Sequence, residues 1–447
     1  MLNKIKKLFS SKEILSGNFG IERETLRLDE NGYLAKSDHP EEFGDKAHNP
    51  YITTDFSESQ IEVITPALPD VKEAYNFTRA LYDIVAMEIG DEYLWPESMP
   101  CIIPDDKDIP VAKFADHSKE SQEYREKLLL KYGGKKQLIS GIHYNFSFNE
   151  SIIEKLYEDS EKNLSYKEFK NSIYLKVARN YLRFRWLIVY LLGAAPVVHE
   201  SFVDSCKCPL KKVSNNEYSS LGAISHRNGK CGYKNKVDLF PSYNSVNEYI
   251  ESIDGYIKDE IIESHKELYS QVRLKPSNTK NFKESLLNEG IKYLEYRTID
   301  INPFEKGGIS LADLRFLQVF NIYLLTKEES EFENWQEEAL ENQQLIAVHG
   351  IDNIELKHDG KCINRIDFGL EILNEVMGIN NELNLGFEDV IKDMIDKVKD
   401  SKLTYAYKIT QKINEEGYIN TFLSLAKGYK ESAYKNRFKL EGYEDLE

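Results

Sequence analysis

A strand is predicted at residues 138–148, and within it residues 142–148 alternate between apolar and polar side chains, a pattern that constrains the fold more than any other stretch of the chain. Successive side chains of a β-strand point to opposite faces of the sheet, so Tyr144 and Phe146 share one face. His143 and Asn145 face the other way. A strand with an apolar back and a polar front packs on a core from one side only. The pattern therefore predicts a sheet with one buried face and one polar face.

Three further segments are predicted as strands because turn residues bracket them: residues 19–28, 291–301 and the less regular 51–65. Helical periodicity fills most of the chain between them, at residues 71–89, 119–132, 166–192, 246–265 and 311–325. This order of elements indicates an α+β fold, a strand-rich core wrapped by helices. The pattern leaves open whether the strands pair parallel or antiparallel.

Two helix starts carry a capping-box signature, in which a hydroxyl and a carboxylate satisfy each other's free backbone amides. They are Ser165 with Glu168, and Ser245 with Glu248. Beyond about residue 334 only amphipathic helices are predicted, at residues 387–399, 403–414 and 419–427. We therefore expect a core at residues 1–330 and a helical extension at residues 331–447, packed together as one structural unit.

The composition points to small-molecule ligands. With 447 residues, 41% of them hydrophobic, the chain can bury a large core. Its formal net charge of −17 argues against nucleic acid or an anionic membrane as a partner, because either polyanion is repelled. An anionic substrate then needs a local positive site built from metal ions and arginines.

Several features favour the cytoplasm. The N-terminal residues lack the continuous apolar core of a signal peptide, and the longest apolar run, residues 186–198, is too short to cross a bilayer. The cysteines show no zinc-ribbon spacing and are odd in number, which predicts free thiols in a reducing compartment. They are Cys101, Cys206, Cys208, Cys231 and Cys362.

Glu22 and Glu24 are the first candidate metal ligands. Period-2 geometry puts them on one strand face with their Cα atoms roughly 7 Å apart. Two carboxylates so close repel unless they are solvated or share a cation, and Mg²⁺ prefers such oxygen ligands. His143 lies on a similar polar face, where its imidazole could ligate the metal. The alternatives are an exposed strand face for the glutamates and a structural or solvated role for the histidine.

Two further segments contribute to this set. Glu295 and Arg297 share a strand face, either as a simple ion pair or as a metal ligand beside an arginine that clamps phosphate. Asp55 and Glu62 have opposite parity, so they cannot share a face of one regular strand. A bulge or loop around residues 57–59 is required to bring them together.

Carboxylates from four segments could together hold two or three Mg²⁺ ions that bind nucleotide phosphates. The chain has no G-x-x-x-x-G-K-[ST], G-x-G-x-x-G, H-E-x-x-H or G-x-S-x-G motif. Classical nucleotide-binding folds and common hydrolases are therefore disfavoured, and a nucleotide site without a P-loop is predicted.

Five ordered blocks carry a family resemblance: FGIERETLR, YITTDFSESQIEVITP, LWPESMPC, SGIHYNFS and YLEYRTIDINPF. Through them the chain resembles the bacterial glutamate-cysteine ligases (γ-glutamylcysteine synthetases) over residues 19–325. The resemblance implies a glutamine-synthetase-like core, in which a curved antiparallel sheet forms an active-site funnel that ATP and amino acids enter from opposite sides. The fused bifunctional relatives carry a further ATP-grasp module that this sequence lacks, so the product expected is γ-glutamylcysteine.

The resemblance also assigns residues by position. The metal- and nucleotide-proximal positions fall on Glu22, Glu24, Asp55, Glu62, His143 and Glu295. The positions that contact amino-acid substrate or phosphoryl groups fall on Phe56, Tyr124, Arg125, Gln137, Arg227, Tyr233, Tyr269, Arg273 and Arg297. Of these, Arg297, Glu295 and Arg125 are the expected catalytic residues. For each tyrosine the alternative is an ordinary aromatic, in a chain with 28 tyrosines.

The activity implied is the ATP-dependent ligation of glutamate, through its γ-carboxylate, to cysteine, the first step of glutathione biosynthesis. It proceeds through γ-glutamyl phosphate and requires Mg²⁺, or Mn²⁺ in its place, but no protein nucleophile. We expect a monomer. The alternatives are a ligase of the same fold with another amine acceptor, a non-catalytic glutamate- or nucleotide-binding regulator, and a metal-dependent phosphatase.

Overall fold

The computed structural model describes residues 1–115, 118–206 and 209–437. Its largest sheet has seven strands in the order β2-β3-β1-β5-β10-β9, with β4 paired to β1 off this path. The strands are β1 (Gly17–Leu28), β2 (Ile52–Thr54), β3 (Gln60–Ile64), β4 (Tyr93–Leu94), β5 (Ile142–Phe148), β9 (Val272–Lys275) and β10 (Tyr293–Ile299). Every pairing is antiparallel. The α+β fold and antiparallel sheet are confirmed, and the sheet is open, with β2 and β9 at its edges.

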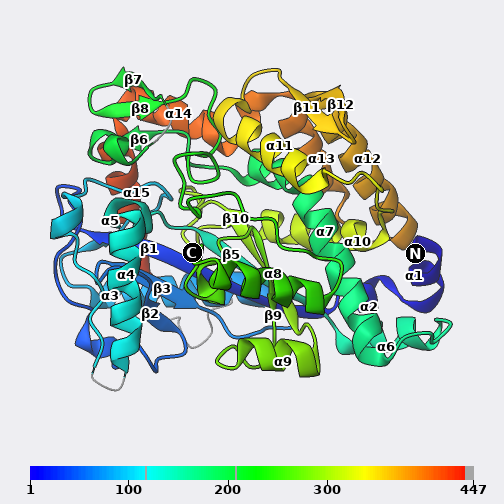
Figure 1. Cartoon of the computed structure of the whole chain (residues 1–447). Coiled ribbons are helices and arrows are strands. Elements are labelled where there is room, and N and C mark those ends of the chain that lie inside the picture. Colours follow the sequence, from blue (N-terminus) through cyan, green and yellow to red (C-terminus); the bar gives the residue numbers. More distant parts are fainter. Residues whose placement is uncertain (116–117, 207–208, 438–447) are drawn as a thin grey trace.

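Fifteen α-helices surround the sheet in the described part of the chain. They are α1 (Leu2–Leu8), α2 (Ser11–Ile14), α3 (Val71–Glu88), α4 (Lys119–Tyr132), α5 (Gly134–Gln137), α6 (Glu150–Glu158), α7 (Tyr166–Leu192), α8 (Val246–Lys258), α9 (Phe282–Glu289), α10 (Leu311–Thr326), α11 (Trp335–His349), α12 (Arg365–Leu383), α13 (Glu388–Lys399), α14 (Tyr405–Glu416) and α15 (Tyr418–Asn436). Short 3₁₀ turns include η4 (Glu200–Ser205) and η5 (His265–Glu267). Figure 1 shows the C-terminal helices, coloured yellow to red, along the upper edge of the molecule.

The predicted helix starts and ends are largely correct, but α15 continues to Asn436, past the predicted end at residue 427, and two further differences lie around α8. Ser165 and Glu168 form the full capping box of α7, but only the Ser245 half forms at α8. Asn244 and Ser242 instead donate to the Glu248 carboxylate. The helix predicted to residue 265 ends at Lys258, because the following segment turns at Glu260, whose φ is +58°.

The apolar back of the sheet packs on α7 and α10, as the alternation of residues 142–148 predicts. Tyr144 on β5 contacts Tyr296 on β10, with ring centroids 5.9 Å apart. Tyr296 in turn stacks on Tyr181 of α7 at 3.8 Å and donates its hydroxyl proton to Asn321 Oδ1 of α10 at 2.7 Å. This packing leaves the opposite face of β1, β5 and β10 for polar side chains.

The C-terminal third is not purely helical, which corrects the prediction. A hairpin joins β11 (Glu355–His358) and β12 (Lys361–Asn364). Asp359 and Gly360 turn it, both with positive φ, as two-residue hairpin loops require. Strands of four residues are too short to produce a readable alternation. A second small sheet, of β6 (Val198–His199), β8 (Glu217–Ser219) and β7 (Lys211–Ser214), was also not predicted.

The last helices pack on the core. Tyr418 and Phe422 of α15 pack their rings on the buried Trp95 at centroid distances of 5.6 and 5.2 Å. The Tyr418 hydroxyl donates to Glu97 Oε2 at 3.0 Å. Residues on both sides of position 330 therefore share one hydrophobic cluster. A domain limit at residue 330 stays a prediction.

One cysteine pair corrects the prediction of free thiols. Cys206 and Cys231 form a disulfide, with their Cα atoms 4.6 Å apart across 25 residues of sequence. The fold brings the end of η4 against the loop before Tyr233, a contact that cysteine spacing does not reveal. Cys101 and Cys362 are free, and Cys208 lies outside the described residues. Within the described ranges, no helix has the length and apolarity needed to cross a membrane.

Candidate active site

The strand register gathers the candidate metal ligands on the polar face of the sheet. Glu22 on β1 lies opposite His143 on β5, and Glu24 lies opposite Glu62 on β3. Glu295 on β10 pairs with Asn145 on β5. Because Glu22 and Glu24 are two residues apart, both side chains point to the same face. Antiparallel pairing alone thus brings four of the predicted ligands and His143 together.

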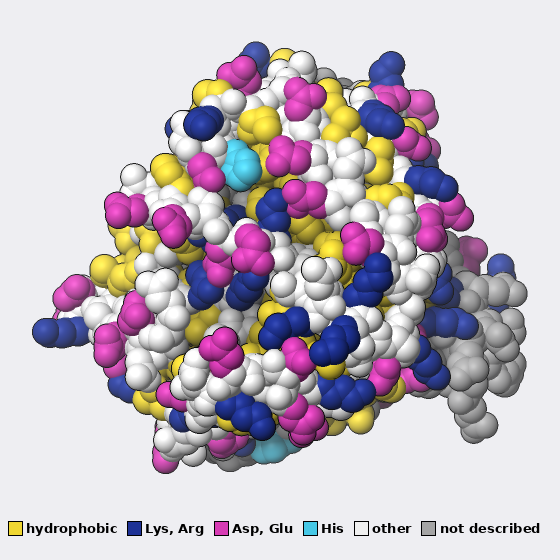
Figure 2. Space-filling view, turned by 90° about the vertical axis from the view of Figure 1, so that its right-hand side faces the viewer, with side chains coloured by type: hydrophobic (Ala, Val, Ile, Leu, Met, Phe, Trp, Pro, Cys, Tyr) yellow, Lys and Arg dark blue, Asp and Glu magenta, His cyan; other side chains and the backbone are white. Residues whose placement is uncertain are grey.

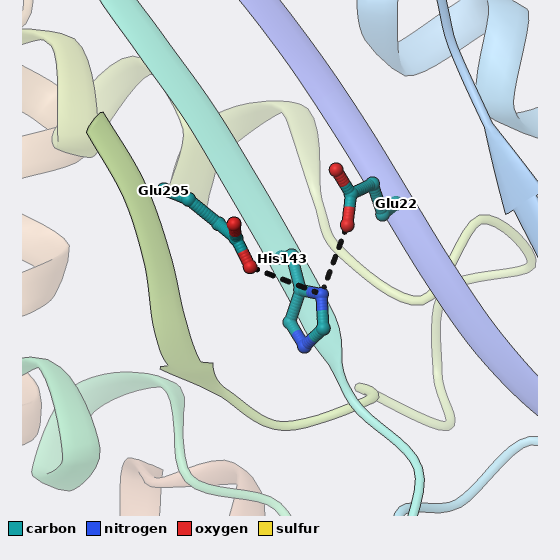
Figure 3. A group of neighbouring side chains, drawn as sticks. All are labelled: Glu22, His143 and Glu295. Atoms are coloured by element: carbon teal, nitrogen blue, oxygen red, sulfur yellow. Dashed lines mark hydrogen bonds and ion pairs between the residues drawn. The ribbon is translucent and has the colours of Figure 1, made fainter. Parts of the chain in front are cut away.

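A first group consists of Glu22, His143 and Glu295, whose carboxylates lie on either side of the imidazole (Figure 3). His143 Nδ1 is 3.0 Å from Glu22 Oε2 and 3.8 Å from Glu295 Oε1. Asn145 donates to Glu22 Oε1 at 2.8 Å and so fixes that carboxylate. One ligand atom from each member lies within 4.8 Å of the others.

A second group, Glu24, Glu62 and His143, meets the same 4.8 Å limit and shares the histidine with the first. Glu24 Oε1 is 3.5 Å from His143 Nε2, and Glu24 Oε2 accepts from the backbone N–H of Gly141 at 2.9 Å. Asp55 belongs to neither group. Asp55 begins the turn between β2 and β3, where the opposite parity of Asp55 and Glu62 required a loop. Its side chain lines one cavity together with the members of both groups.

Two cationic side chains already contact the first group. Lys275 on β9 pairs with Glu295 Oε2, and Arg297 donates to Glu295 Oε1. Burial alone raises the pKa of Glu295, but Lys275 and Arg297 outweigh it and hold that pKa well below its usual range. Burial likewise acts to raise the pKa of Glu22, and the hydrogen bond with His143 brings it below its ordinary value. This side of the site is ionised without added metal.

The carboxylates of the second group resist ionisation. Burial, followed by repulsion from Asp55, raises the pKa of Glu24 to about 8. Burial and the neighbouring carboxylates raise the pKa of Glu62 well above its ordinary value. Burial, followed by repulsion from Arg297, lowers the pKa of His143 to about 4, which keeps the imidazole neutral and able to ligate. A bound cation would favour the ionised form of Glu24 and Glu62.

The donor set fits a hard divalent cation. Carboxylate oxygens with one imidazole suit Mg²⁺ or Mn²⁺, whereas soft metals prefer thiolates, and the described cavity lining contains no cysteine. The carboxylates form two adjacent pairs, Glu22 with Glu295 and Glu24 with Glu62, and the neutral imidazole of His143 could ligate an ion at either pair but not at both at once. The residues present therefore fit the predicted metal.

These residues line a cavity of about 650 Å³, large enough for a nucleotide and an amino acid together. Every residue predicted for metal, catalysis or substrate binding lines it. Its cationic members are Arg125, Arg227, Arg273, Arg297, Lys234, Lys266 and Lys275. Elsewhere acidic and basic side chains intermingle, as the face in Figure 2 shows. Because the same lining carries six carboxylates, these cations and bound metal ions together would supply the local positive charge that a chain of charge −17 needs for anionic ligands.

Three of the arginines also hold the backbone of the walls. Arg227 donates to the carbonyls of Arg297 at 2.8 Å and Ile299 at 3.1 Å. Arg125 donates to the carbonyl of Asp55 and so holds the β2–β3 turn. Arg273 donates to the carbonyl of Leu268. These three arginines therefore shape the cavity in addition to their predicted role in substrate binding.

Sequence reasoning missed two parts of the site. Lys275 and Arg273 are two residues apart on β9, so their side chains point to the same face of the sheet. This shared face was the sequence signal that could have identified Lys275. The other part comes from α11, which contributes Leu340, Gln343 and Gln344 to the cavity. Gln343 donates to the carbonyl of Asn228 at 3.0 Å and so ties α11 to the wall. No local pattern marked this helix.

The fold and this site define a class of protein in which the polar face of an open antiparallel sheet carries candidate metal ligands beside a cluster of cationic side chains. The family model described as "Glutamate-cysteine ligase" matches residues 2–346. The chain belongs to the glutamate-cysteine ligase family.

Three relatives show the extent of the likeness. A glutamate–cysteine ligase of Clostridium acetobutylicum is 34% identical, over 90% of this chain and 90% of its own length. The glutathione biosynthesis bifunctional protein GshAB of Clostridium perfringens is 42% identical over 97% of this chain, but the chain spans only 56% of that protein. A crystal structure of glutamate–cysteine ligase from Francisella tularensis in complex with AMP superposes with a TM-score of 0.88, at 28% identity over 96% of this chain and 92% of that one.

Proposed function

We propose that this chain joins the γ-carboxylate of glutamate to the amine of cysteine, with ATP converted to ADP and phosphate. The observation that carries the proposal is the cavity itself, in which metal-ligating carboxylates, arginines and a tyrosine wall converge. The family, and a relative of similar length named for this reaction, support it. The product, γ-glutamylcysteine, is the precursor of glutathione.

Two ions of Mg²⁺, or of Mn²⁺, are proposed, one held by Glu22 and Glu295 and the other by Glu24 and Glu62, with the single free ring nitrogen of His143 ligating one of them. Asp55 is placed to hold a third, because it lines the cavity beside Glu24. When bound, such ions neutralise the charge of nucleotide phosphates during phosphoryl transfer. A bound AMP in the Francisella tularensis relative supports a nucleotide site in this fold.

The protein's own cations would orient the phosphoryl group. Arg297 and Lys275 flank Glu295 from two sides, and both line the cavity. The γ-carboxylate oxygen attacks the γ-phosphorus and ADP leaves. The cysteine nitrogen then attacks the γ-carbonyl carbon and phosphate leaves. Fixed cations beside the reacting groups lower both barriers without a protein nucleophile.

Cysteine is assigned to the wall formed by Phe56, Tyr124, Gln137, Tyr233 and Tyr269, which we call the acceptor wall. The Tyr233 hydroxyl donates to that of Tyr269, with the ring centroids 4.3 Å apart. Arg125, Arg227 and Arg273 frame this wall and are proposed to meet carboxylate or phosphoryl groups.

Product formation tests the proposal directly. Purified protein is incubated with ATP, Mg²⁺ and glutamate, with cysteine, 2-aminobutyrate or no amine, and both ADP and the γ-glutamyl product are measured. We expect ADP release that requires an amine, with the highest kcat/KM for cysteine. A preference for another amine would change only the acceptor. ADP release without any amine, or none at all, would contradict the ligase assignment.

A further inference from the structure

A fully buried carboxylate, Glu267, lies behind the acceptor wall and has no part in the proposed chemistry. Its side chain is 0% exposed, and Lys131 Nζ lies 2.5 Å from Oε1. Oε1 also accepts a hydrogen bond from the Tyr132 hydroxyl, and Oε2 accepts one from the backbone N–H of Glu263 at 2.7 Å. A buried carboxylate is tolerated only when it is compensated in this way. Its partners therefore show what it holds in place.

Asn235 connects the backbone of Glu267 and the Tyr132 hydroxyl to the segments that carry both wall tyrosines. Its amide donates to the Glu267 carbonyl at 2.7 Å and to the Tyr132 hydroxyl at 3.3 Å. Its Oδ1 accepts from the backbone N–H of Tyr269 at 3.0 Å. Since Asn235 follows Tyr233 by two residues, one amide side chain ties together the segments that carry both wall tyrosines.

Tyr132 supports the same two rings from behind. It meets Tyr233 and Tyr269 edge-on, with centroids 5.8 Å away in each case and interplanar angles of 79° and 78°. Burial, then the hydrogen bond to Glu267, raises the pKa of Tyr132, so its hydroxyl keeps its proton and donates it. Tyr132 and Glu267 are not among the described residues that line the cavity.

We propose that Tyr132, Asn235 and Glu267, here called the Glu267 network, position Tyr233 and Tyr269 and thereby set the affinity and selectivity for the acceptor amine. The inference rests on the proposed function. Tyr269 is held by its backbone N–H, by its ring and by its hydroxyl, each through a different partner. Loss of one partner lets the hydroxyl pair move relative to the bound acceptor.

Selectivity follows from the chemistry of the acceptor. Cysteine and 2-aminobutyrate differ only in a thiol against a methyl group, so shape alone separates them weakly. Two hydroxyls held at a fixed position give the thiol a polar partner that the methyl group cannot use. If the hydroxyls are free to move, this advantage is lost while the phosphoryl-transfer half of the site is unchanged.

The test compares Tyr132→Phe and Glu267→Gln with Tyr166→Phe. Tyr132→Phe keeps the ring and removes only the hydroxyl that joins Glu267 and Asn235. Tyr166 also donates to a glutamate, Glu150, but lies outside the cavity lining and serves as the matched control. KM for ATP, glutamate and acceptor, kcat, and Tm are measured for each protein, with cysteine and 2-aminobutyrate as acceptors.

We expect Tyr132→Phe and Glu267→Gln to raise the KM for cysteine about fivefold to tenfold, the loss of roughly one hydrogen bond. The cysteine preference over 2-aminobutyrate should fall, with kcat and the KM values for ATP and glutamate within about twofold. The double variant should resemble either single one, because both act through one network. Tyr166→Phe should change no KM.

Two outcomes would overturn the network. One is an equal rise in all three KM values, and the other is a lower Tm with the cysteine KM unchanged, either of which indicates a purely structural role. Failure of the proposed function is seen separately, because wild-type protein would then form no γ-glutamyl product. If the wild type prefers another amine, the network is tested with that amine.

Discussion

Replacing Glu24 by glutamine should stabilise the metal-free protein at neutral pH while it abolishes the reaction. Glu24 is buried among other carboxylates, and its pKa is raised from 4.5 to about 8, first by burial and then by Asp55. The stability linked to this raised pKa is fully present below pH 4.5 and is lost as the pH rises through 8. A neutral glutamine carries no such penalty and can still accept from the Gly141 N–H.

The size of the effect follows from the pKa. In the unfolded chain Glu24 ionises with a pKa of 4.5, and pH 7 lies about 2.5 units above that value. At about 1.4 kcal/mol per unit, the suppressed ionisation in the folded state lowers the free energy of unfolding of the wild type by about 3 kcal/mol. With an unfolding entropy of about 2 cal/mol/K per residue over 447 residues, this corresponds to about 3 °C in Tm. At pH 4.5 the two proteins should melt together.

Thermal unfolding in EDTA at pH 4.5, 7 and 8, and again with saturating Mg²⁺, measures this difference. Wild-type protein should gain more from Mg²⁺ than Glu24→Gln, because only the native state with its ligands intact binds the ion tightly. Glu329→Gln is the control, for which a change in Tm of the opposite sign is expected. Burial raises the pKa of Glu329, but Arg179 and Arg183 bring it below its ordinary value, so this glutamine should lower Tm at pH 7. A Glu24→Gln protein that melts at or below wild type in EDTA at pH 8 would refute the reasoning.

Three further predictions concern the cations and the C-terminal helices. Arg297→Lys should lower kcat about 100-fold with little change in Tm, because a point charge lacks the planar fork; near-native turnover would remove Arg297 from catalysis. Lys275→Gln should weaken Mg²⁺-ATP binding about 10-fold or more but leave AMP binding within about twofold, measured by calorimetry; equal losses would place Lys275 away from the outer phosphates. Removal of residues 331–447 should give protein without a cooperative melting transition, because Phe422 and Tyr418 no longer cover Trp95.

The alternation of apolar and polar residues correctly predicted which side chains share a face of the main strands, and the structure shows why. The apolar back of β5 packs on α7 and α10, so its side-chain pattern follows from burial on one face. The parity argument at Asp55 and Glu62 also led to the loop between β2 and β3. Pairing direction and register were beyond the pattern, because they depend on which strands meet; the family resemblance supplied the antiparallel direction, and only the structure supplies the register.

Other parts of the site depend on contacts between distant segments and leave no local trace. The disulfide between Cys206 and Cys231 joins a 3₁₀ turn to a loop, and neither has a periodic pattern. Gln343 reaches the cavity because α11 packs along α7, where Arg185 donates to its Oε1. A polar residue on such a helix looks the same in sequence whether it faces solvent or a cavity wall.

The distribution of charge across the cavity gives the two halves of the sheet different roles. On the β9–β10 side Lys275 and Arg297 already compensate Glu295, so that half is formed before any ligand arrives. On the β1–β3 side Glu24 and Glu62 face each other, and burial and repulsion raise both of their pKa values. A divalent ion that enters there displaces these protons and compensates the charges of the carboxylates as they ionise. Metal binding and ionisation of this half are therefore linked, and the metal affinity of the whole protein should rise steeply between pH 6 and 8.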